Sequence, residues 1–239
     1  MPDSETEIVK INSEEPVPWE WLARVLHFSD SALPVGAYAH SFGLEGVCQM
    51  GIVHDKETLG TFLHRDVVAT LTRIDLPLVA RAYEAAMDGK IDELRKLDQL
   101  SFALRPTRQL REAASRIGKQ QASIYSRTWS DGDNICATLI HQQSPVVLGA
   151  LHAQEKAPVM AALWSMAYQT YSALLQAALK LLPIGPAATQ ELLHGSLMII
   201  RNQLDSSRHM TIDEIGCFNP VWDIGASQHE HATARLFIS

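Results

Sequence analysis

One serine lies in a short motif that could support nucleophilic chemistry. Residues 39–43 read Ala-His-Ser-Phe-Gly and nearly match the G-x-S-x-G nucleophile elbow around Ser41. That motif works because a sharp strand-to-helix turn lifts the serine above a sheet. The sequence before Ser41 predicts no strand, and no alternating pattern of strands and helices follows it. The motif therefore favours a loop-to-helix transition, and a serine hydrolase that uses Ser41 is the less favoured alternative.

A second candidate for chemistry is the run His229-Glu230-His231 near the end of the chain. A zinc protease needs H-E-x-x-H, because residues four apart share one face of a helix. Residues two apart point in different directions on a helix, although they share a face in an extended chain. The other histidines lack ligand spacing, so we predict no protein-held metal site and no cofactor. A nickel-binding or nickel-storage protein that uses His229 and His231 is the alternative.

The sequence also lacks the glycine-rich loop that binds nucleotide phosphates. Gly118-Lys119 is followed by Gln120 and has no glycine at the required upstream position. We therefore expect no nucleotide hydrolysis by this chain alone. Together with the two motifs above, this favours a protein that is not an enzyme.

Charge and cysteine content restrict the expected partners and the expected cellular compartment of the protein. The formal net charge is −7, and lysine and arginine are dispersed without a basic run, so neither nucleic acid nor a membrane surface is an expected partner. Cys48, Cys136 and Cys217 are far apart and form no C-x-x-C pair, so neither a zinc clip nor a disulfide framework is expected. A reducing compartment, the cytoplasm, is the simplest expectation.

Hydrophobic periodicity predicts helices along almost the whole chain. Residues 1–16 are acidic and predict a disordered leader, and residues 17–239 predict one domain. After the N-cap candidate Asp55, apolar residues recur at spacings of three and four. The expected helices span 55–74, 76–87, 91–104, 106–129, 133–142, 145–154, 158–182 and 187–204. The fold class is therefore all-α, a single-domain bundle of roughly eight to ten helices.

Two of these helices carry special features. The segment 158–182 is apolar enough to suggest a membrane span, but Gln169, Gln176 and Lys180 favour a buried helix. In the helix 106–129, Ala114, Gly118 and Ala122 form a strip of small residues at spacing four. A mid-helix glycine costs about 1 kcal/mol relative to alanine, so this strip predicts a close packing contact.

Four segments carry patterns that occur together in one known family. They are residues 26–45 (LHFSDSALPVGAYAHSFGLE), residues 144–149 (SPVVLG), residues 178–185 (ALKLLPIG), and a terminal set comprising Phe218-Asn219-Pro220, Gln228-His229-Glu230 and 234–239 (ARLFIS). They lie in the same order as in the urease accessory protein F (UreF) family, which the chain resembles from Trp19 onward. It departs from the family pattern at Lys180, where arginine is usual, and at Pro186, where glutamine is usual.

The resemblance implies a helical homodimer that helps insert nickel into apo-urease. In this family the partners are urease accessory protein D, also called H, and the GTP-hydrolysing accessory protein G. The resemblance thus implies a non-catalytic urease maturation factor that assembles with D/H and G on apo-urease and modulates the GTPase activity of G.

The resemblance also implies a set of partner-binding residues. They are Ser29, Asp30, Tyr38, His40, Phe42, Glu45, Tyr171, Lys180, His229, Glu230, Arg235 and Phe237. For the aromatic members the alternative is ordinary core packing, and for the run Ser29-Asp30-Ser31 it is a turn before Pro34. We expect the C-terminal tail to bind the D/H protein, and its loss to spare the fold. The alternative is a tail that packs on its own core.

Overall fold

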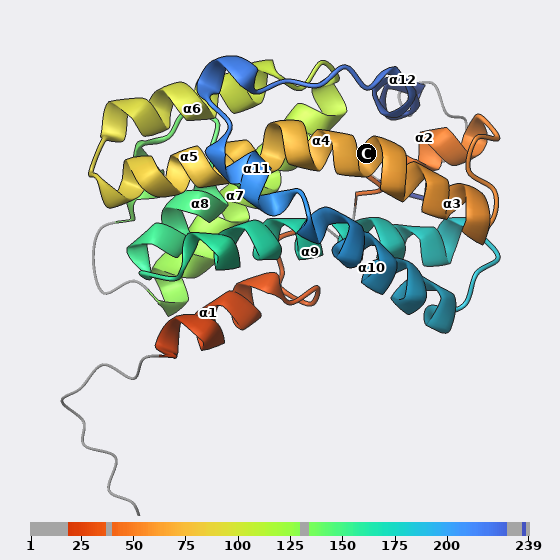
Figure 1. The fold of residues 1–239 in the computed structure, drawn as a ribbon, viewed down its shortest axis with the longest axis horizontal. Helices are drawn as coiled ribbons and strands as arrows, with labels where there is room; N and C mark the ends of the chain where they lie inside the picture. Colours follow the sequence, from red (N-terminus) through yellow and green to blue (C-terminus); the bar gives the residue numbers. More distant parts are fainter. Residues whose placement is uncertain (1–18, 37–39, 130–133, 229–235, 238–239) are drawn as a thin grey trace, which may run out of the picture.

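The computed structural model describes residues 19–36, 40–129, 134–228 and 236–237, and within these ranges every regular element is a helix or a helical turn (Figure 1). The all-α prediction is confirmed. The elements are α1 (Glu20–Ser29), α2 (Leu44–Gln49), α3 (Lys56–Phe62), α4 (Val68–Thr70), α5 (Leu76–Met87), α6 (Ile91–Ala103), α7 (Arg108–Thr128), α8 (Ser144–Gln154), α9 (Val159–Leu181), α10 (Pro186–Arg201), α11 (Leu204–His209) and α12 (Pro220–Gln228). The predicted disordered leader, residues 1–16, lies outside the described residues.

The segment 56–87 forms one continuous helix, and the prediction of two helices there is wrong. Two π-helical turns, Leu63–Val67 and Leu71–Asp75, join α3, α4 and α5, and Asp75 keeps helical angles (φ −71°, ψ −49°). Pro77 removes a backbone donor from this helix. The main chain is satisfied from elsewhere, because Ser207 Oγ donates to the Thr72 carbonyl at 2.9 Å and Gly216 N donates to the Arg73 carbonyl at 3.0 Å.

The predicted helix 133–142 is also wrong. Between residues 134 and 143 the structure has only the short 3₁₀ turn Ile135–Thr138. Asn134 Oδ1 accepts a hydrogen bond from Cys136 N (2.9 Å), which begins the turn. Farther along, the buried carboxylate of Asp98 accepts bonds from His141 N (2.7 Å) and Gln143 N (2.8 Å). These side-chain contacts hold the segment in a non-helical path.

The core lies on both sides of α5. One group of buried side chains joins the segment 59–80 to α9 and α10, and another joins α5 to α1, α6, α7 and α8. At the crossing of α5 and α8, a Cβ atom on Gly149 would lie 2.3 Å from the Val79 carbonyl oxygen, so only glycine fits there. The expected buried helix 158–182 is α9, and no helix of the described ranges is both long and apolar enough to span a bilayer.

The segment between α11 and α12 is attached to the long helix 56–87. Asn219 Nδ2 donates to the Asp66 carbonyl at 2.8 Å and contacts Thr70 Oγ1 at 3.0 Å. Asp66 lies in the first π-helical turn, a geometry that leaves main-chain carbonyls available to outside donors. Asn219 therefore attaches the segment that precedes α12 to the helical body.

We expect Asn219→Ala to lower the free energy of unfolding by about 2 kcal/mol, because the Asp66 carbonyl would lose its buried donor. Chemical denaturation measures this change. Asn202→Ala is the control, because Asn202 is exposed after α10 and should change stability by less than about 0.5 kcal/mol. Equal stability of both variants would show that the Asn219 contacts do not stabilise the fold.

We expect His152 to make the stability of the fold sensitive to acid. Its side chain is buried in α8, its Nδ1 lies 2.8 Å from the Leu148 carbonyl, and its Nε2 has no hydrogen-bond partner among the described residues. Burial lowers its pKa from 6.5 to about 4. The unfolded chain therefore binds a proton at a higher pH than the folded chain does, and unfolding is favoured as the pH falls from 6.5 toward 4.

We expect this group alone to cost about 2 kcal/mol of stability between neutral pH and about pH 5. His152→Leu should remove that part of the pH dependence, whatever its effect at neutral pH. Denaturation of both proteins at the two pH values measures it. His209→Gln is the control, because His209 is exposed. An unchanged pH dependence in His152→Leu would show that His152 takes up a proton as readily in the folded chain as in the unfolded chain.

Candidate functional site

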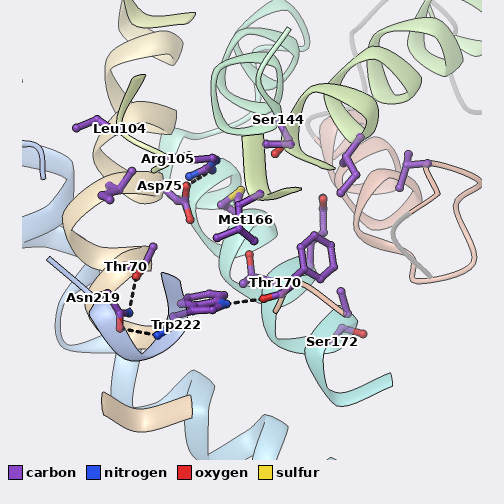
Figure 2. Close-up of a pocket in the computed structure, with 18 of the residues that line it drawn as sticks. Thr70, Asp75, Leu104, Arg105, Ser144, Met166, Thr170, Ser172, Asn219 and Trp222 are labelled. Carbon is purple, nitrogen blue, oxygen red and sulfur yellow. Dashed lines mark hydrogen bonds and ion pairs between the residues drawn. The ribbon is translucent and has the colours of Figure 1, made fainter. Parts of the chain in front are cut away.

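A cavity of about 150 Å³ opens between parts of the chain that are distant in sequence (Figure 2). Its walls come from the end of α1 and the loop after it, the π-helical turn 71–75, α7, α9 and the segment 217–223. The apolar side chains that line it include Phe28, Val35, Ile74, Leu104, Leu110, Ile117 and Met166. An apolar concavity with a few polar groups is the usual form of a binding site.

Three of the four family-like segments meet at this cavity. Ser29, Asp30 and Phe42 come from the first segment, Ser144 from the second and Asn219 from the terminal set. Trp222 Nε1 donates a hydrogen bond to the Phe42 carbonyl, which ties the first segment to α12. The fold therefore brings together residues that the sequence places almost 200 positions apart.

Local backbone geometry explains how the first segment reaches the cavity. Phe42 has φ +52° and Gly43 has φ +82°, so the chain turns through left-handed conformations just before α2. A Cβ on Gly43 would lie 2.9 Å from Cβ of Ala226 in α12, so this turn needs glycine for space as well as for conformation. The predicted loop-to-helix transition at Ser41 is thus the geometry that the structure shows.

Charged groups occupy one side of the cavity (Figure 2). Arg105 Nη2 lies 2.6 Å from Asp75 Oδ1, and these two side chains are only 11% and 8% exposed. Asp223 also lines the cavity, where burial raises the pKa of its carboxyl group and the Arg105 guanidinium partly offsets this. Asp30 Oδ1 accepts a hydrogen bond from Ala32 N (2.9 Å). This bond fits the turn before Pro34 that is the alternative for the run Ser29-Asp30-Ser31.

A second group of family-like residues meets at the end of the chain. Glu45 Oε1 in α2 accepts a hydrogen bond from Leu236 N at 2.8 Å, and Lys180 Nζ lies 5.0 Å from the ring centroid of Phe237. The Phe237 side chain is buried and belongs to the core that α9 and α10 share. The structure therefore brings Glu45, Lys180 and Phe237 together. Phe237 packs on the core of its own chain, as expected from the alternative to a partner-binding tail.

Other expected partner-binding residues are buried or partly buried. Tyr171 is fully enclosed in the core, and burial raises the pKa of its hydroxyl group. His40 is also buried, with its ring centroid 6.0 Å from that of Phe42. Ser29 Oγ lies 2.7 Å from Ser165 Oγ of α9. Core packing was the alternative for the aromatic residues, and it accounts for the position of Tyr171. Partner binding by Tyr171, His40 and Ser29 stays a prediction.

Of the two motifs that could support chemistry, the structure describes only the one around Ser41, from His40 onward, and it gives Ser41 no strand-to-helix turn. Ser41 is completely buried, and no strand precedes it within residues 19–36 or from residue 40 onward. No cluster of three or more histidine, cysteine, aspartate or glutamate side chains in the described part of the chain has the geometry for a metal ion. His229, Glu230 and His231 lie outside the described residues, as do Tyr38 and Arg235.

Sequence reasoning missed the residues that give the cavity its charge and one of its walls. Asp75, Arg105, Trp222 and Asp223 belong to no recognisable motif. The only sequence signal near any of them was the Asn219-Pro220 pair, which precedes Trp222 and starts α12. Their proximity arises from packing of separate helices, so spacing along the chain could not reveal it.

The known proteins that resemble this chain are urease accessory proteins. The model of the UreF family matches residues 53–197. A urease accessory protein UreF from Xanthobacter autotrophicus is 30% identical over 211 residues, which cover 87% of each chain. A UreF from Trichormus variabilis is 26% identical and covers 90% of this chain and 94% of its own length. A bifunctional urease accessory protein UreEF from Bordetella bronchiseptica is 28% identical over 91% of this chain and 52% of its own length.

Proposed function

Because the chain belongs to the UreF family of urease accessory proteins, we propose that it is a non-catalytic factor that helps insert nickel into apo-urease. The observation that carries this proposal is the family match, which covers residues 53–197 and is extended by relatives across about nine-tenths of the chain. Nickel is the cargo of this reaction, and the chain contributes binding surfaces. The burial of Ser41 supports the non-catalytic assignment.

We propose the D/H protein and the GTPase G as direct partners, with apo-urease as the target of the complex. The UreEF relative supports a role beside other accessory proteins, because in that protein a UreF-like half is joined to a second half in one chain. The proposed action on G is a change in its rate of GTP hydrolysis.

We also propose that the chain forms a homodimer in the cytoplasm. Helix α1 exposes Trp19 at its start and Leu22 and Leu26 along one side. Exposed apolar side chains that share one side of a helix fit a protein contact. The absence of a disulfide framework in the sequence fits a reducing compartment.

Reconstitution of urease maturation tests the proposed function. Apo-urease, the D/H protein, G, nickel and GTP are combined with and without this chain, and urease activity is measured. We expect activation to require the chain, and we expect the isolated chain to show no urease, GTPase or esterase activity. Equal activation without it would contradict the proposal, as would esterase turnover that disappears in Ser41→Ala.

A measurement of nickel binding tests the nickel-storage alternative. Nickel binding to the isolated chain is measured by calorimetry and compared with the variant in which His229 and His231 are both alanine. Stoichiometric binding that is lost in this variant would support storage. A maturation factor that contributes only binding surfaces should instead activate urease without such binding.

A further inference from the structure

We propose that the cavity of Figure 2 binds an apolar side chain of a partner protein that has a lysine or arginine next to it. This inference rests on the proposed function, because an accessory factor acts through protein partners. It goes beyond that function by naming the chemistry of the segment that binds.

The shape and lining of the cavity fit one apolar side chain. A volume of about 150 Å³ matches a single aromatic ring, because an apolar protein cavity of this size can hold benzene. Phe28, Ile74 and Met166 supply apolar contact surface on different elements. An aromatic or aliphatic side chain anchored in such a pocket is the usual centre of a protein interface.

The charges around the cavity favour a cation beside that side chain. Four charged side chains line it, namely Asp30, Asp75, Arg105 and Asp223, and Arg105 forms an ion pair with Asp75. No hydrogen bond or ion pair from another described residue reaches the Asp223 carboxylate. Asp30 uses one oxygen in its turn and is otherwise exposed. The cavity therefore has a net negative charge, and an ammonium or guanidinium group of a partner would offset the unfavourable burial of the Asp223 charge.

The same charge argues against occupants from this chain. Its N-terminal leader, residues 1–16, contains Lys10 between two apolar residues, but its five carboxylates would bring net negative charge toward Asp30 and Asp223. A second copy carries the same formal net charge of −7, so it offers no excess of cations to pair with Asp223. A partner with a basic residue beside an apolar one is the occupant that matches both features of the cavity.

Short peptides can test this chemistry on the isolated full-length chain. The probes are acetyl-Phe-Lys-amide, acetyl-Phe-Glu-amide and acetyl-Gly-Lys-amide. Binding is followed by nuclear magnetic resonance of isotope-labelled methionine methyl groups, because Met166 lines the cavity whereas Met198 is exposed on α10. We expect the Phe-Lys peptide to shift the Met166 signal and not the Met198 signal. The Phe-Glu peptide should bind about tenfold more weakly, and the Gly-Lys peptide weaker still.

Two variants separate the apolar and the charged contributions. Ala173 lines the cavity, so Ala173→Phe should fill it and abolish the Met166 shift. Ala187→Phe is the control, because Ala187 is exposed near the start of α10. Asp223→Asn should retain binding of the phenylalanine side chain and reduce the preference for lysine over glutamate. This second variant keeps the test valid if Ala173→Phe does not fold.

Three results would overturn the inference. They are equal binding of the Phe-Lys and Phe-Glu peptides, an unchanged Met166 shift in a folded Ala173→Phe variant, and no shift with any peptide at up to about 10 mM. The peptide measurement contains no urease and no accessory protein other than this chain. Failure of the maturation assay with intact peptide binding would therefore reject the proposed function alone, and the opposite pattern would reject only the cavity inference.

Discussion

Replacing Phe237 with alanine is expected to lower the free energy of unfolding by about 3 kcal/mol, the cost usual for loss of a buried phenylalanine ring. Although Phe237 is the third residue from the end of the chain, its side chain is only 7% exposed. The ring packs into the core with α9 and α10, and the Lys180 ammonium group lies over it. Thermal and chemical denaturation measure the effect.

The neighbouring residue provides a matched control. Leu236 is 69% exposed, so Leu236→Ala should change the free energy of unfolding by less than about 0.5 kcal/mol. If Leu236→Ala weakens binding of the D/H protein without lowering the melting temperature, the tail has two roles, with Phe237 holding it and Leu236 contacting the partner. Equal melting temperatures of Phe237→Ala and the unaltered protein would show that the ring does not stabilise the core.

These two residues also bear on the deletion of residues 229–239. The sequence suggested that this deletion would spare the fold, because the tail lies beyond the last strongly periodic helix. The burial of Phe237 and the bond from Leu236 N to Glu45 instead favour a drop in melting temperature. Partner binding by the tail remains a prediction, and the point variants test it without removing the buried ring.

Most helices could be predicted from the sequence because their signals are local. The spacing of apolar residues located α6, α7, α8, α9 and α10 to within a few residues. The continuous helix 56–87 could not be recognised, because the donors that satisfy Thr72 and Arg73 come from Ser207 and Gly216, more than 130 positions later. Pro77 favours a new helix at 76–87 by its local preference for the first turn, whereas the contacts from Ser207 and Gly216 keep the helix continuous.

The candidate site was only partly predictable, for a related reason. The family-like segments contained Ser29, Asp30, Phe42 and Asn219, so one edge of the cavity was indicated in advance. Its charged side was not indicated, because Asp75 and Arg105 are 30 positions apart and become partners only when the long helix packs beside the end of α6. A single sequence does not show which distant side chains will meet.

The strip of small residues in α7 leads to the other large expected effect. Ala114, Gly118 and Ala122 are buried, as the predicted close contact requires. A Cβ atom on Gly118 would lie 1.9 Å from the Gln142 carbonyl oxygen and 3.0 Å from Ser144 N. The close neighbour is therefore the backbone that leads into α8 of the same chain, so a substitution should act on the fold itself.

That backbone cannot move away easily. Asp98 holds it through His141 N and Gln143 N, and Gln143 Nε2 donates to Ser115 Oγ of α7 at 2.6 Å. Overpacking commonly costs about 1–3 kcal/mol when flexible side chains can adjust. Because the atom in the way at Gly118 is a fixed carbonyl oxygen, we expect Gly118→Leu to cost more than about 3 kcal/mol and to displace the start of α8.

Gly195 gives the matched control for Gly118, because it also lies inside a helix, α10, but in a roomier place. The nearest atom to a Cβ on Gly195 would be Nε2 of His64 at 3.9 Å. Gly195→Ala should therefore raise stability by up to about 1 kcal/mol through helix propensity, whereas Gly118→Ala should lower it. Chemical denaturation of both alanine variants and of Gly118→Leu measures the difference. If the two alanine variants shift stability in the same direction and by the same amount, the contact between α7 and the start of α8 is looser than 1.9 Å implies.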